Sequence, residues 1–208
     1  MNTAPHELEL VQRYRLEPVV YNWKGWQALL QRAAADGPPL GVHLELDTGM
    51  NRLGLTDEAL PQLLQELEAK PSGLTIKGIF SHLAAADDAA HDAFTQQQQQ
   101  RFEAWSQQLL AVLPAPPLRH LLNSAGIERH TAAQYDMVRL GIGVYGLGQR
   151  AALQPVLTLK TTVAQLKMVA AGETVGYSRQ GVVAPGTRLA VLSIGYADGF
   201  LRGLGNGA

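Results

Sequence analysis

The first three quarters of the chain alternate between short apolar runs and longer amphipathic stretches. The runs have the length and composition of strands, and the stretches between them repeat apolar residues at helical spacing. Strands are predicted at 17–23, 40–47, 74–84, 118–124 and 136–146, and helices at 26–35, 57–70 and 87–113, with a short helical turn after 124. Such alternation is typical of parallel strands joined by crossover helices, in an open sheet or a barrel.

The pattern changes after Arg150. Strand-like runs at 156–169, 173–178 and 187–197 are separated by glycine-containing turns, with no helical period between them. The sequence therefore predicts an α/β domain at 1–150 and the beginning of an all-β domain at 151–208, divided between Gln149 and Pro155. A closed barrel needs eight strand–helix units and only about five are found, so either the sheet is open or the chain starts partway through a barrel.

One low-complexity tract, Gln96 to Gln100, interrupts the longest predicted helix. It precedes Phe102, Trp105 and Leu109, whose spacing of three and four marks one apolar helix face. We expect the glutamines to form the solvated face of a surface helix.

Composition narrows the possible partners. Seventeen basic and eighteen acidic residues give a net charge of -1 over 208 residues, which provides no electrostatic basis for binding nucleic acid or a membrane surface. Small polyanionic ligands remain candidates. The absence of cysteine excludes disulfides and thiolate metal sites and favours the cytoplasm, and no metal site is predicted. The apolar runs are too short to span a membrane, and the N-terminus lacks the order of a signal peptide.

A G-x-G-x-x-G pattern at Gly141, Gly143 and Gly146 suggests phosphate binding. A dinucleotide site would need a helix after the glycines and an acidic residue about twenty positions on. No Asp or Glu occurs between Asp136 and Glu173, which argues against that site. A turn after a late barrel strand can instead bind a single phosphate through backbone N–H groups. Taken alone, the loop favours a third interpretation, in which the glycines only permit tight turns.

Five segments carry more information in their order than any one does alone. They lie at 43–55, with D-T-G-M-N-R-L-G, and at 78–88, 121–126, 135–147 and 193–202, the last with G-Y-A-D-G. Together they closely resemble the alanine racemase family, whose members use pyridoxal 5′-phosphate. The resemblance implies a partial TIM (β/α)8-type barrel followed by the start of a β domain, and an isomerase that interconverts L- and D-alanine for peptidoglycan.

The resemblance also implies a cofactor site. Arg139 matches the arginine that faces the pyridine nitrogen, and because a guanidinium accepts no proton it would keep that nitrogen unprotonated. This favours proton exchange at the α-carbon over transamination or elimination. Gly141 and Ile142 match backbone donors to the cofactor phosphate, and Ser124, in the segment that begins at Asn123, matches a hydroxyl donor. Asn123 is assigned to the cofactor site with them.

Racemisation requires a proton-transfer group on each face of the substrate. Tyr196 matches one of the two catalytic bases, and His82 matches the histidine that hydrogen-bonds this tyrosine and is linked to Arg139. In the family the tyrosine enters the partner's active site, so the resemblance implies a homodimer with shared sites. Without the resemblance, His82 would be interpreted as a core residue with satisfied hydrogen bonds.

Arg52 matches the arginine that binds the substrate carboxylate, a role suited to its paired donors. Seven residues earlier, where many relatives have a lysine that becomes carbamylated, this chain has Glu45. A glutamate carries the negative charge permanently, so we hypothesise that Glu45 orients Arg52. The alternative is a surface glutamate on an exposed strand position.

The chain departs further from the family at the lysine that forms the Schiff base. No lysine lies in a matching motif, and Lys77, on a predicted barrel strand, is the one substitute candidate among Lys24, Lys70, Lys77, Lys160 and Lys167. A further tyrosine and a methionine-bearing loop follow the position of Ala208 in the family order. The resemblance therefore places this chain in the middle of the family pattern, and we expect it to be inactive alone.

Two alternatives remain open beside a racemase for alanine. The chain could be a noncatalytic module that binds the cofactor or forms dimers, and the missing lysine separates this function from catalysis. A racemase for another amino acid, such as serine, is the other alternative, because segments outside this chain largely set substrate size.

The Glu45 hypothesis predicts that Glu45→Lys creates a protein sensitive to carbamate formation. Adding bicarbonate to this variant should change its behaviour, whereas the parent chain should not respond. A Glu45→Lys variant that ignores bicarbonate would remove the hypothesis.

Overall fold

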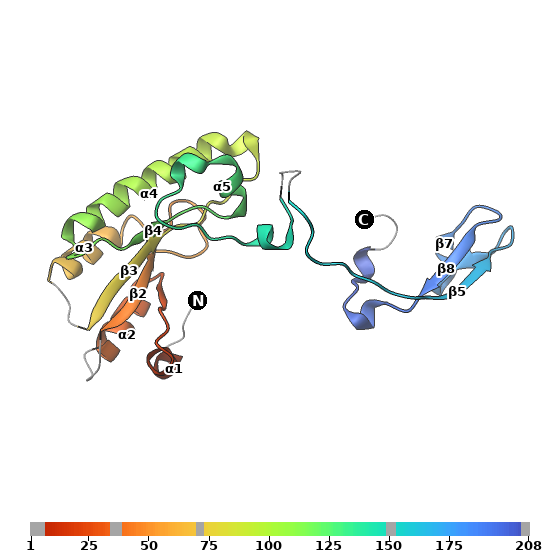
Figure 1. Ribbon diagram of the computed structural model, residues 1–208, viewed down its shortest axis with the longest axis horizontal. Coiled ribbons are helices and arrows are strands. Elements are labelled where there is room, and N and C mark those ends of the chain that lie inside the picture. Colours follow the sequence, from red (N-terminus) through yellow and green to blue (C-terminus); the bar gives the residue numbers. More distant parts are fainter. Residues whose placement is uncertain (1–6, 34–38, 70–72, 149–152, 205–208) are drawn as a thin grey trace. The chain divides into compact units, whose positions relative to one another are not determined.

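A parallel sheet organises the first part of the chain. In the computed structural model, residues 7–33, 39–69, 73–148 and 153–204 are described, and the chain divides into units Met1–Val156 and Leu157–Ala208. The sheet has four parallel strands in sequential order (Figure 1). They are β1 (Val19–Val20), β2 (Leu40–Glu45), β3 (Leu74–Phe80) and β4 (Leu118–His120).

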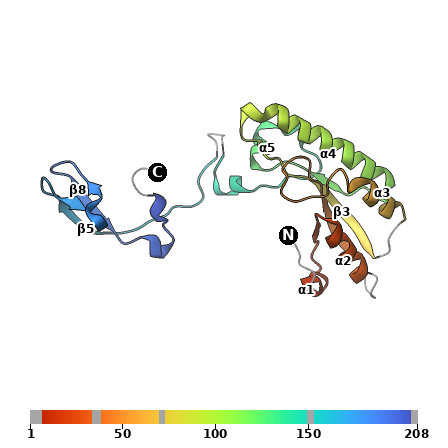
Figure 2. The same ribbon diagram turned by 180° about the vertical axis from the view of Figure 1, so that it is seen from behind.

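A helix follows each of the four strands as the apolar spacing predicted, and one short helix, which was not predicted, precedes β1. These helices are α1 (Leu8–Arg13), α2 (Trp23–Ala33), α3 (Leu60–Glu68), α4 (Asp92–Val112) and α5 (Ser124–Arg129), with 3-10 turns η2 (Ala89–His91) and η3 (Thr131–Ala133). Helices α3 and α4 lie side by side along the sheet (Figures 1 and 2). Pro61 is accepted because it lies in the first turn of α3, where its missing N–H has no helical partner. Lys70, at the end of the predicted helix, is outside the described residues.

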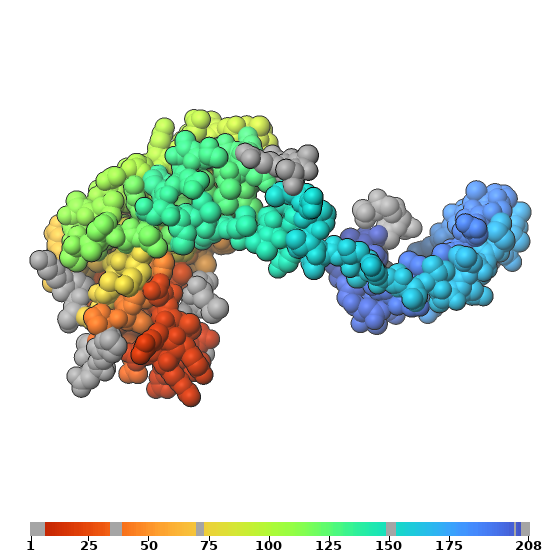
Figure 3. All heavy atoms as spheres, in the orientation of Figure 1, coloured from red at the N-terminus to blue at the C-terminus, as the bar shows by residue number. Residues whose placement is uncertain are grey.

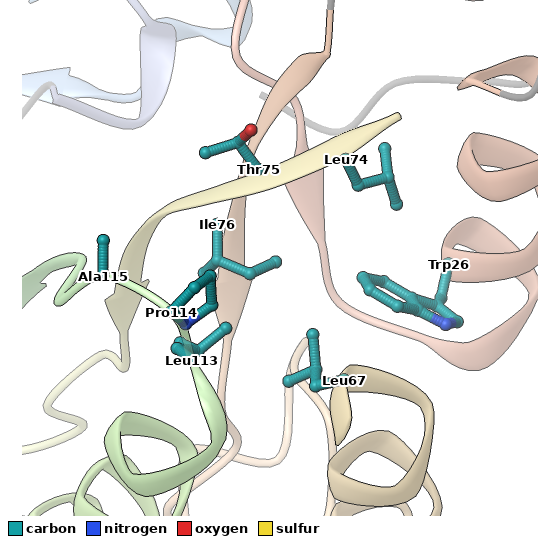
Figure 4. A pocket seen from close by; sticks show the side chains of 8 residues that line it. All are labelled: Trp26, Leu67, Leu74, Thr75, Ile76, Leu113, Pro114 and Ala115. Atoms are coloured by element: carbon teal, nitrogen blue, oxygen red, sulfur yellow. The ribbon is translucent and has the colours of Figure 1, made fainter. Parts of the chain in front are cut away.

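The core lies between the helices and one face of the sheet. Val42, Leu44 and Ile79 of the strands are fully buried, as are Trp26 and Phe102 of the helices. At the end of the core where β3 begins, an apolar pocket is lined by Trp26, Leu67, Leu74, Thr75, Ile76, Leu113, Pro114 and Ala115 (Figure 4). Apolar walls give this pocket no group for acid–base chemistry, and the polar residues gather at the opposite end of the strands.

The prediction of a fifth strand at 136–146 is wrong, except that one residue of this segment pairs with β4. Asp136 N donates to Arg119 O (3.0 Å) and Arg139 N to Leu122 O (3.0 Å), but the only ladder pairing found in the described part of this segment is the bridge of Met137 to His120. The chain then turns into the 3-10 helix η4 (Ile142–Tyr145), closed by Gly146 with φ 76°. The glycines end the extended conformation because they allow backbone that a strand does not use.

The second unit consists of short antiparallel pairs. Strand β5 (Val163–Met168) pairs with β8 (Arg188–Leu192), and β6 (Thr174–Val175) pairs with β7 (Gly181–Val182), while 3-10 turns η5 (Tyr177–Arg179), η6 (Tyr196–Asp198) and η7 (Arg202–Leu204) connect or follow them. Val169 is the only buried side chain in its described part. The first unit, by contrast, contains every other buried hydrophobic side chain of the described residues. Helix α4 and the segment after it form part of one face of this unit (green in Figure 3). Within the described ranges, no helix is both long and apolar enough to cross a bilayer.

Candidate active site

The carboxyl ends of the strands converge on one edge of the sheet, where (β/α) proteins place functional groups. Glu45 ends β2, Ser81 and His82 follow β3, and His120 ends β4. Arg139 comes from the extended segment that runs beside β4. The topology thus gathers residues that are almost a hundred positions apart in sequence.

The Arg139 guanidinium joins two strand ends. Its Nη2 donates to the carbonyl oxygens of Ser81 (2.6 Å) and Leu121 (3.3 Å), and its Nη1 donates to the carbonyl oxygen (3.0 Å) and Nδ1 (2.6 Å) of His120. Its Cζ lies 4.9 Å from the centroid of the Phe80 ring. Burial lowers the pKa of Arg139 to about 10, so the group stays charged at neutral pH. Several acceptors hold it in one orientation.

Two histidines beside Arg139 are held neutral. His82 Nδ1 lies 3.5 Å from Arg139 Nη2, and burial, assisted by the charges of Arg139 and Arg52, lowers the His82 pKa. Burial lowers the pKa of His120 to about 3, with the Arg139 charge contributing in the same direction. The predicted link between His82 and Arg139 is therefore a contact at the limit of a hydrogen bond.

A hydroxyl and two backbone N–H groups meet at the glycine loop. The N–H groups of Gly141 and Gly143 donate to Ser124 Oγ at 2.9 and 3.1 Å. Ile142, predicted as a phosphate donor, makes no such bond here and its side chain is exposed. The donor set suits a phosphate oxygen, which could accept from the same N–H groups and from the hydroxyl. Among the described residues after these glycines, at 147–148 and 153–204, there is no α-helix, so the dinucleotide interpretation lacks its required context.

Asn123 shapes the chain beside this donor set. Its side-chain oxygen accepts from Gly126 N (2.9 Å) and caps α5, and its Nδ2 donates to Leu83 O (3.2 Å). Both ends of the amide are therefore occupied by protein groups, which fixes the start of α5 and with it Ser124.

The loop after β2 places Arg52. Asp47 Oδ1 accepts from Gly49 N and Asn51 N, each at 3.0 Å, and Gly54 has φ 130° with no room for a side chain against Asp47. The D-T-G-M-N-R-L-G sequence thus builds a closed turn whose glycines adopt backbone that other residues rarely use. Arg52 is exposed on this turn and makes no hydrogen bond or ion pair to the described residues.

Glu45 is a buried carboxyl, so its interpretation as a surface glutamate is wrong. The residue is 7% exposed. Burial raises its pKa, an effect that the charges of Arg52 and Arg139 oppose. Glu45 therefore interacts electrostatically with both arginines, but no hydrogen bond joins Glu45 to Arg52 in the described structure. Its role in orienting Arg52 stays a hypothesis.

Gln98 corrects the expectation that the glutamine tract is solvated. Its side chain is fully buried, whereas Gln96, Gln97 and Gln100 are exposed. Gln98 Oε1 accepts from Ala84 N (2.9 Å), and Nε2 donates to His82 O (3.0 Å) and Thr48 Oγ1 (3.3 Å). The amide thereby ties α4 to the segment of His82 and to the loop that carries Arg52.

Two further predicted groups are Tyr196 and Lys77. Tyr196 belongs to the second unit and is 74% exposed, so its hydrogen bond to His82 stays a prediction. Lys77 is exposed on β3 and has no hydrogen bond or ion pair within the described part of the chain. Among the described residues, no group of three or more His, Cys, Asp or Glu side chains could hold a metal ion.

The sequence did not identify His120 or Gln98, and it indicated Gly143 only as part of the G-x-G-x-x-G pattern. The spacing of Gln98 four residues before Phe102 places it on the apolar face of α4 and could have identified it as buried. His120 carried a weaker signal, a polar residue within an apolar run. Nothing in the sequence distinguished Gly143 from Ile142 as a donor.

Comparison with known proteins gives one family along the chain. Residues 1–149 match the family model "Alanine racemase, N-terminal domain", and residues 156–208 match "Alanine racemase, C-terminal domain". The alanine racemase of Symbiobacterium thermophilum is 37% identical over 211 residues, which cover 99% of this chain and 55% of that protein. The chain thus spans about half the length of the relatives it matches.

Solved structures of alanine racemases are also similar to this chain. The biosynthetic alanine racemase from Pseudomonas aeruginosa has a TM-score of 0.79 and 33% identity, over 96% of this chain and 55% of that one. Alanine racemase from Bartonella henselae, described with covalently bound pyridoxal phosphate, has a TM-score of 0.75 and 30% identity, over 98% and 56% of the two chains. These similarities confirm the fold class expected from the resemblance, a partial (β/α)8-type barrel followed by part of a β domain.

Replacing Gln98 should destabilise the first unit. Gln98→Leu leaves the N–H of Ala84 and the carbonyl of His82, whose hydrogen bonds to Gln98 are part-buried, without this partner, at a cost of about 2 kcal/mol. Gln97→Leu, at the exposed neighbouring position, should change stability by less than about 0.5 kcal/mol. Urea unfolding followed by tryptophan fluorescence measures the difference, since Trp23, Trp26 and Trp105 all lie in this unit. Equal effects of the two substitutions would contradict the assigned role.

The low pKa of His120 predicts a pH-dependent stability difference. Between pH 6.5 and about 3 the unfolded chain binds a proton at His120 that the folded chain does not, so this group removes stability as the pH falls. His120→Asn keeps an acceptor for Arg139 without titrating. The stability of the parent relative to this variant should fall through that window in urea titrations at several pH values, and a constant difference would show that His120 is not held neutral.

Proposed function

The chain belongs to the alanine racemase family, and we propose that its first unit carries the pyridine- and phosphate-recognising part of a racemase site for alanine. The observation that supports this most strongly is the Arg139 guanidinium, held by acceptors from two strand ends. The Ser124 donor set begins only four residues after His120, one of those acceptors. Residues 1–150 and 151–208 are proposed as the barrel part and the β-domain part.

The residues present fit pyridoxal 5′-phosphate. Ser124 Oγ with the N–H groups of Gly141 and Gly143 would hold its phosphate, and Asn123 and Ile142 are assigned to the same region. Arg139 would face its ring nitrogen as a donor that keeps its own proton at neutral pH. When bound, this cofactor withdraws electrons from the bonds of the substrate α-carbon.

The chain's own groups would then handle the proton and the carboxylate. Arg52, exposed on the turn after β2, is proposed to bind the carboxylate of alanine. Tyr196 is proposed as a base on one face of the substrate, with His82 hydrogen-bonded to its hydroxyl. Neutral His82 suits this role because it can accept a proton. A homodimer with shared sites, in the cytoplasm and supplying D-alanine for peptidoglycan, completes the proposal.

Cofactor binding without turnover is the second candidate. Lys77 is exposed and no described contact joins it to Arg139 or Ser124. A site that holds the ring and phosphate without a lysine in reach would bind the cofactor and leave alanine unchanged.

The phosphate donors can be tested with pyridoxine 5′-phosphate, which needs no lysine. Ser124→Ala removes a hydroxyl donor and should weaken binding about tenfold, the effect of roughly 1.4 kcal/mol from one hydrogen bond to a charged group. Ser193→Ala, in the second unit, should bind as the parent does. Calorimetric titration measures both, and unphosphorylated pyridoxine serves as the ligand control. No binding by the parent, or equal binding by Ser124→Ala, would contradict the assigned site.

Turnover is measured by incubating the chain with pyridoxal 5′-phosphate and L-alanine in D2O. Racemisation predicts loss of the α-proton NMR signal together with formation of D-alanine. Binding of the phosphate ligand without either change would support the noncatalytic candidate.

A further inference from the structure

A line of side chains leaves Arg139 on the side of His120 and ends at the surface. His120 Nδ1 receives Arg139 Nη1 at 2.6 Å, and His120 Nε2 lies 3.4 Å from His43 Nδ1. His43 Nε2 lies 2.9 Å from Glu17 Oε2. These contacts thus connect Arg139, in the segment after β4, with His43 on β2 and with Glu17, which lies two residues before β1.

Arg139 fixes the direction of every hydrogen bond in this line. A guanidinium only donates, so His120 Nδ1 must be an acceptor and the proton of neutral His120 must lie on Nε2. That proton points to His43 Nδ1, which leaves the His43 proton on Nε2. The Nε2–H of His43 then faces the Glu17 carboxylate, which only accepts. The Arg139 donor at one end and the Glu17 acceptor at the other therefore require the same arrangement of protons on the two histidines.

The local backbone makes room for this contact. The pairing of β2 with β3 shifts register between Val42 and His43, so that His43 lies opposite Gly78. A methyl group on Gly78 would overlap His43 Nδ1 and lie 3.1 Å from His120 Nε2. A glycine within a strand often marks such a close approach. The two imidazoles occupy the space that a side chain at position 78 would fill.

We propose that Glu17 and His43 are positioning residues for Arg139, acting through His120. The inference rests on the proposed function, since it concerns the arginine assigned to the cofactor ring. In the reverse arrangement, His43 would carry its proton on Nδ1 and His120 on Nδ1. Two donors would then face each other at Arg139, and Glu17 would lose its partner. The Glu17 carboxylate therefore favours the arrangement that keeps Arg139 bound to His120.

A surface ion pair of no consequence would look similar at Glu17 alone, because its side chain is 49% exposed. The two interpretations differ in what they predict for His43 and Arg139. An incidental pair leaves the His43 proton and the Arg139 side chain unaffected by the loss of Glu17. A positioning role requires that both respond, although Arg139 is separated from Glu17 by two imidazole rings.

The experiment is 15N NMR of the histidine and arginine side chains in the 208-residue chain, without cofactor or alanine. The parent should show His43 and His120 each as the Nε2–H tautomer. In Glu17→Leu, the His43 signals should move to a mixture of tautomers and the side-chain hydrogens of Arg139 should exchange faster with water. Glu17→Gln, which offers an uncharged oxygen acceptor, should restore the His43 pattern.

Glu68→Leu is the matched control, because Glu68 is an exposed glutamate on α3 without a hydrogen bond in the described structure. A parent His43 that is protonated on both nitrogens or on Nδ1 would overturn the proposal. So would Arg139 exchange that is equal in Glu17→Leu and Glu68→Leu. If Glu17→Leu fails to fold, Gly78→Ala separates the imidazoles instead and should also speed the Arg139 exchange. The proposed function is tested by ligand binding, so either can fail while the other stands.

Discussion

The hydrogen bonds of the Arg139 guanidinium are the constraint on which the site depends. A charged group that is largely removed from water must be surrounded by acceptors, and here the carbonyls that end β3 and β4 supply them. These carbonyls are available because the strands stop there and their ladders no longer use them. The end of a parallel sheet thus creates a cradle for one arginine, and the neutral His120 completes it.

Around this cradle, polar side chains replace the packing that a continuous strand would give. Gln98 reaches from α4 to the segment of His82 and to the loop before Arg52, and Ser124 gathers the N–H groups of the glycine loop. Each of these hydrogen bonds joins residues that are far apart in the sequence. They position the groups proposed to bind the carboxylate and the phosphate without an extended element beneath them.

The sequence predicted the parallel sheet because β2 and β3 are apolar runs whose burial leaves little choice of structure. It failed at 136–146, where apolar residues suggest a strand but the N–H groups of Gly141 and Gly143 bond to Ser124 instead of a ladder. The prediction that the glutamine tract is solvated failed at Gln98. Five identical residues do not show which of them faces the core unless the helical period of α4 is applied to them. The family resemblance identified Arg139, His82 and Ser124, whereas the line from Arg139 to Glu17 depends on a register shift that no sequence pattern indicated.

Arg139 is proposed to be fixed as a donor toward the ring nitrogen of pyridoxal 5′-phosphate. The most direct measurement is the 15N chemical shift of that nitrogen in labelled cofactor added to the chain, at neutral pH. We expect the shift of an unprotonated pyridine nitrogen in the parent chain, and a change of this shift when Arg139 is replaced by glutamate, a residue that can favour the protonated ring. A pyridinium shift in the parent chain, or a shift identical to that of the free cofactor, would contradict this proposal.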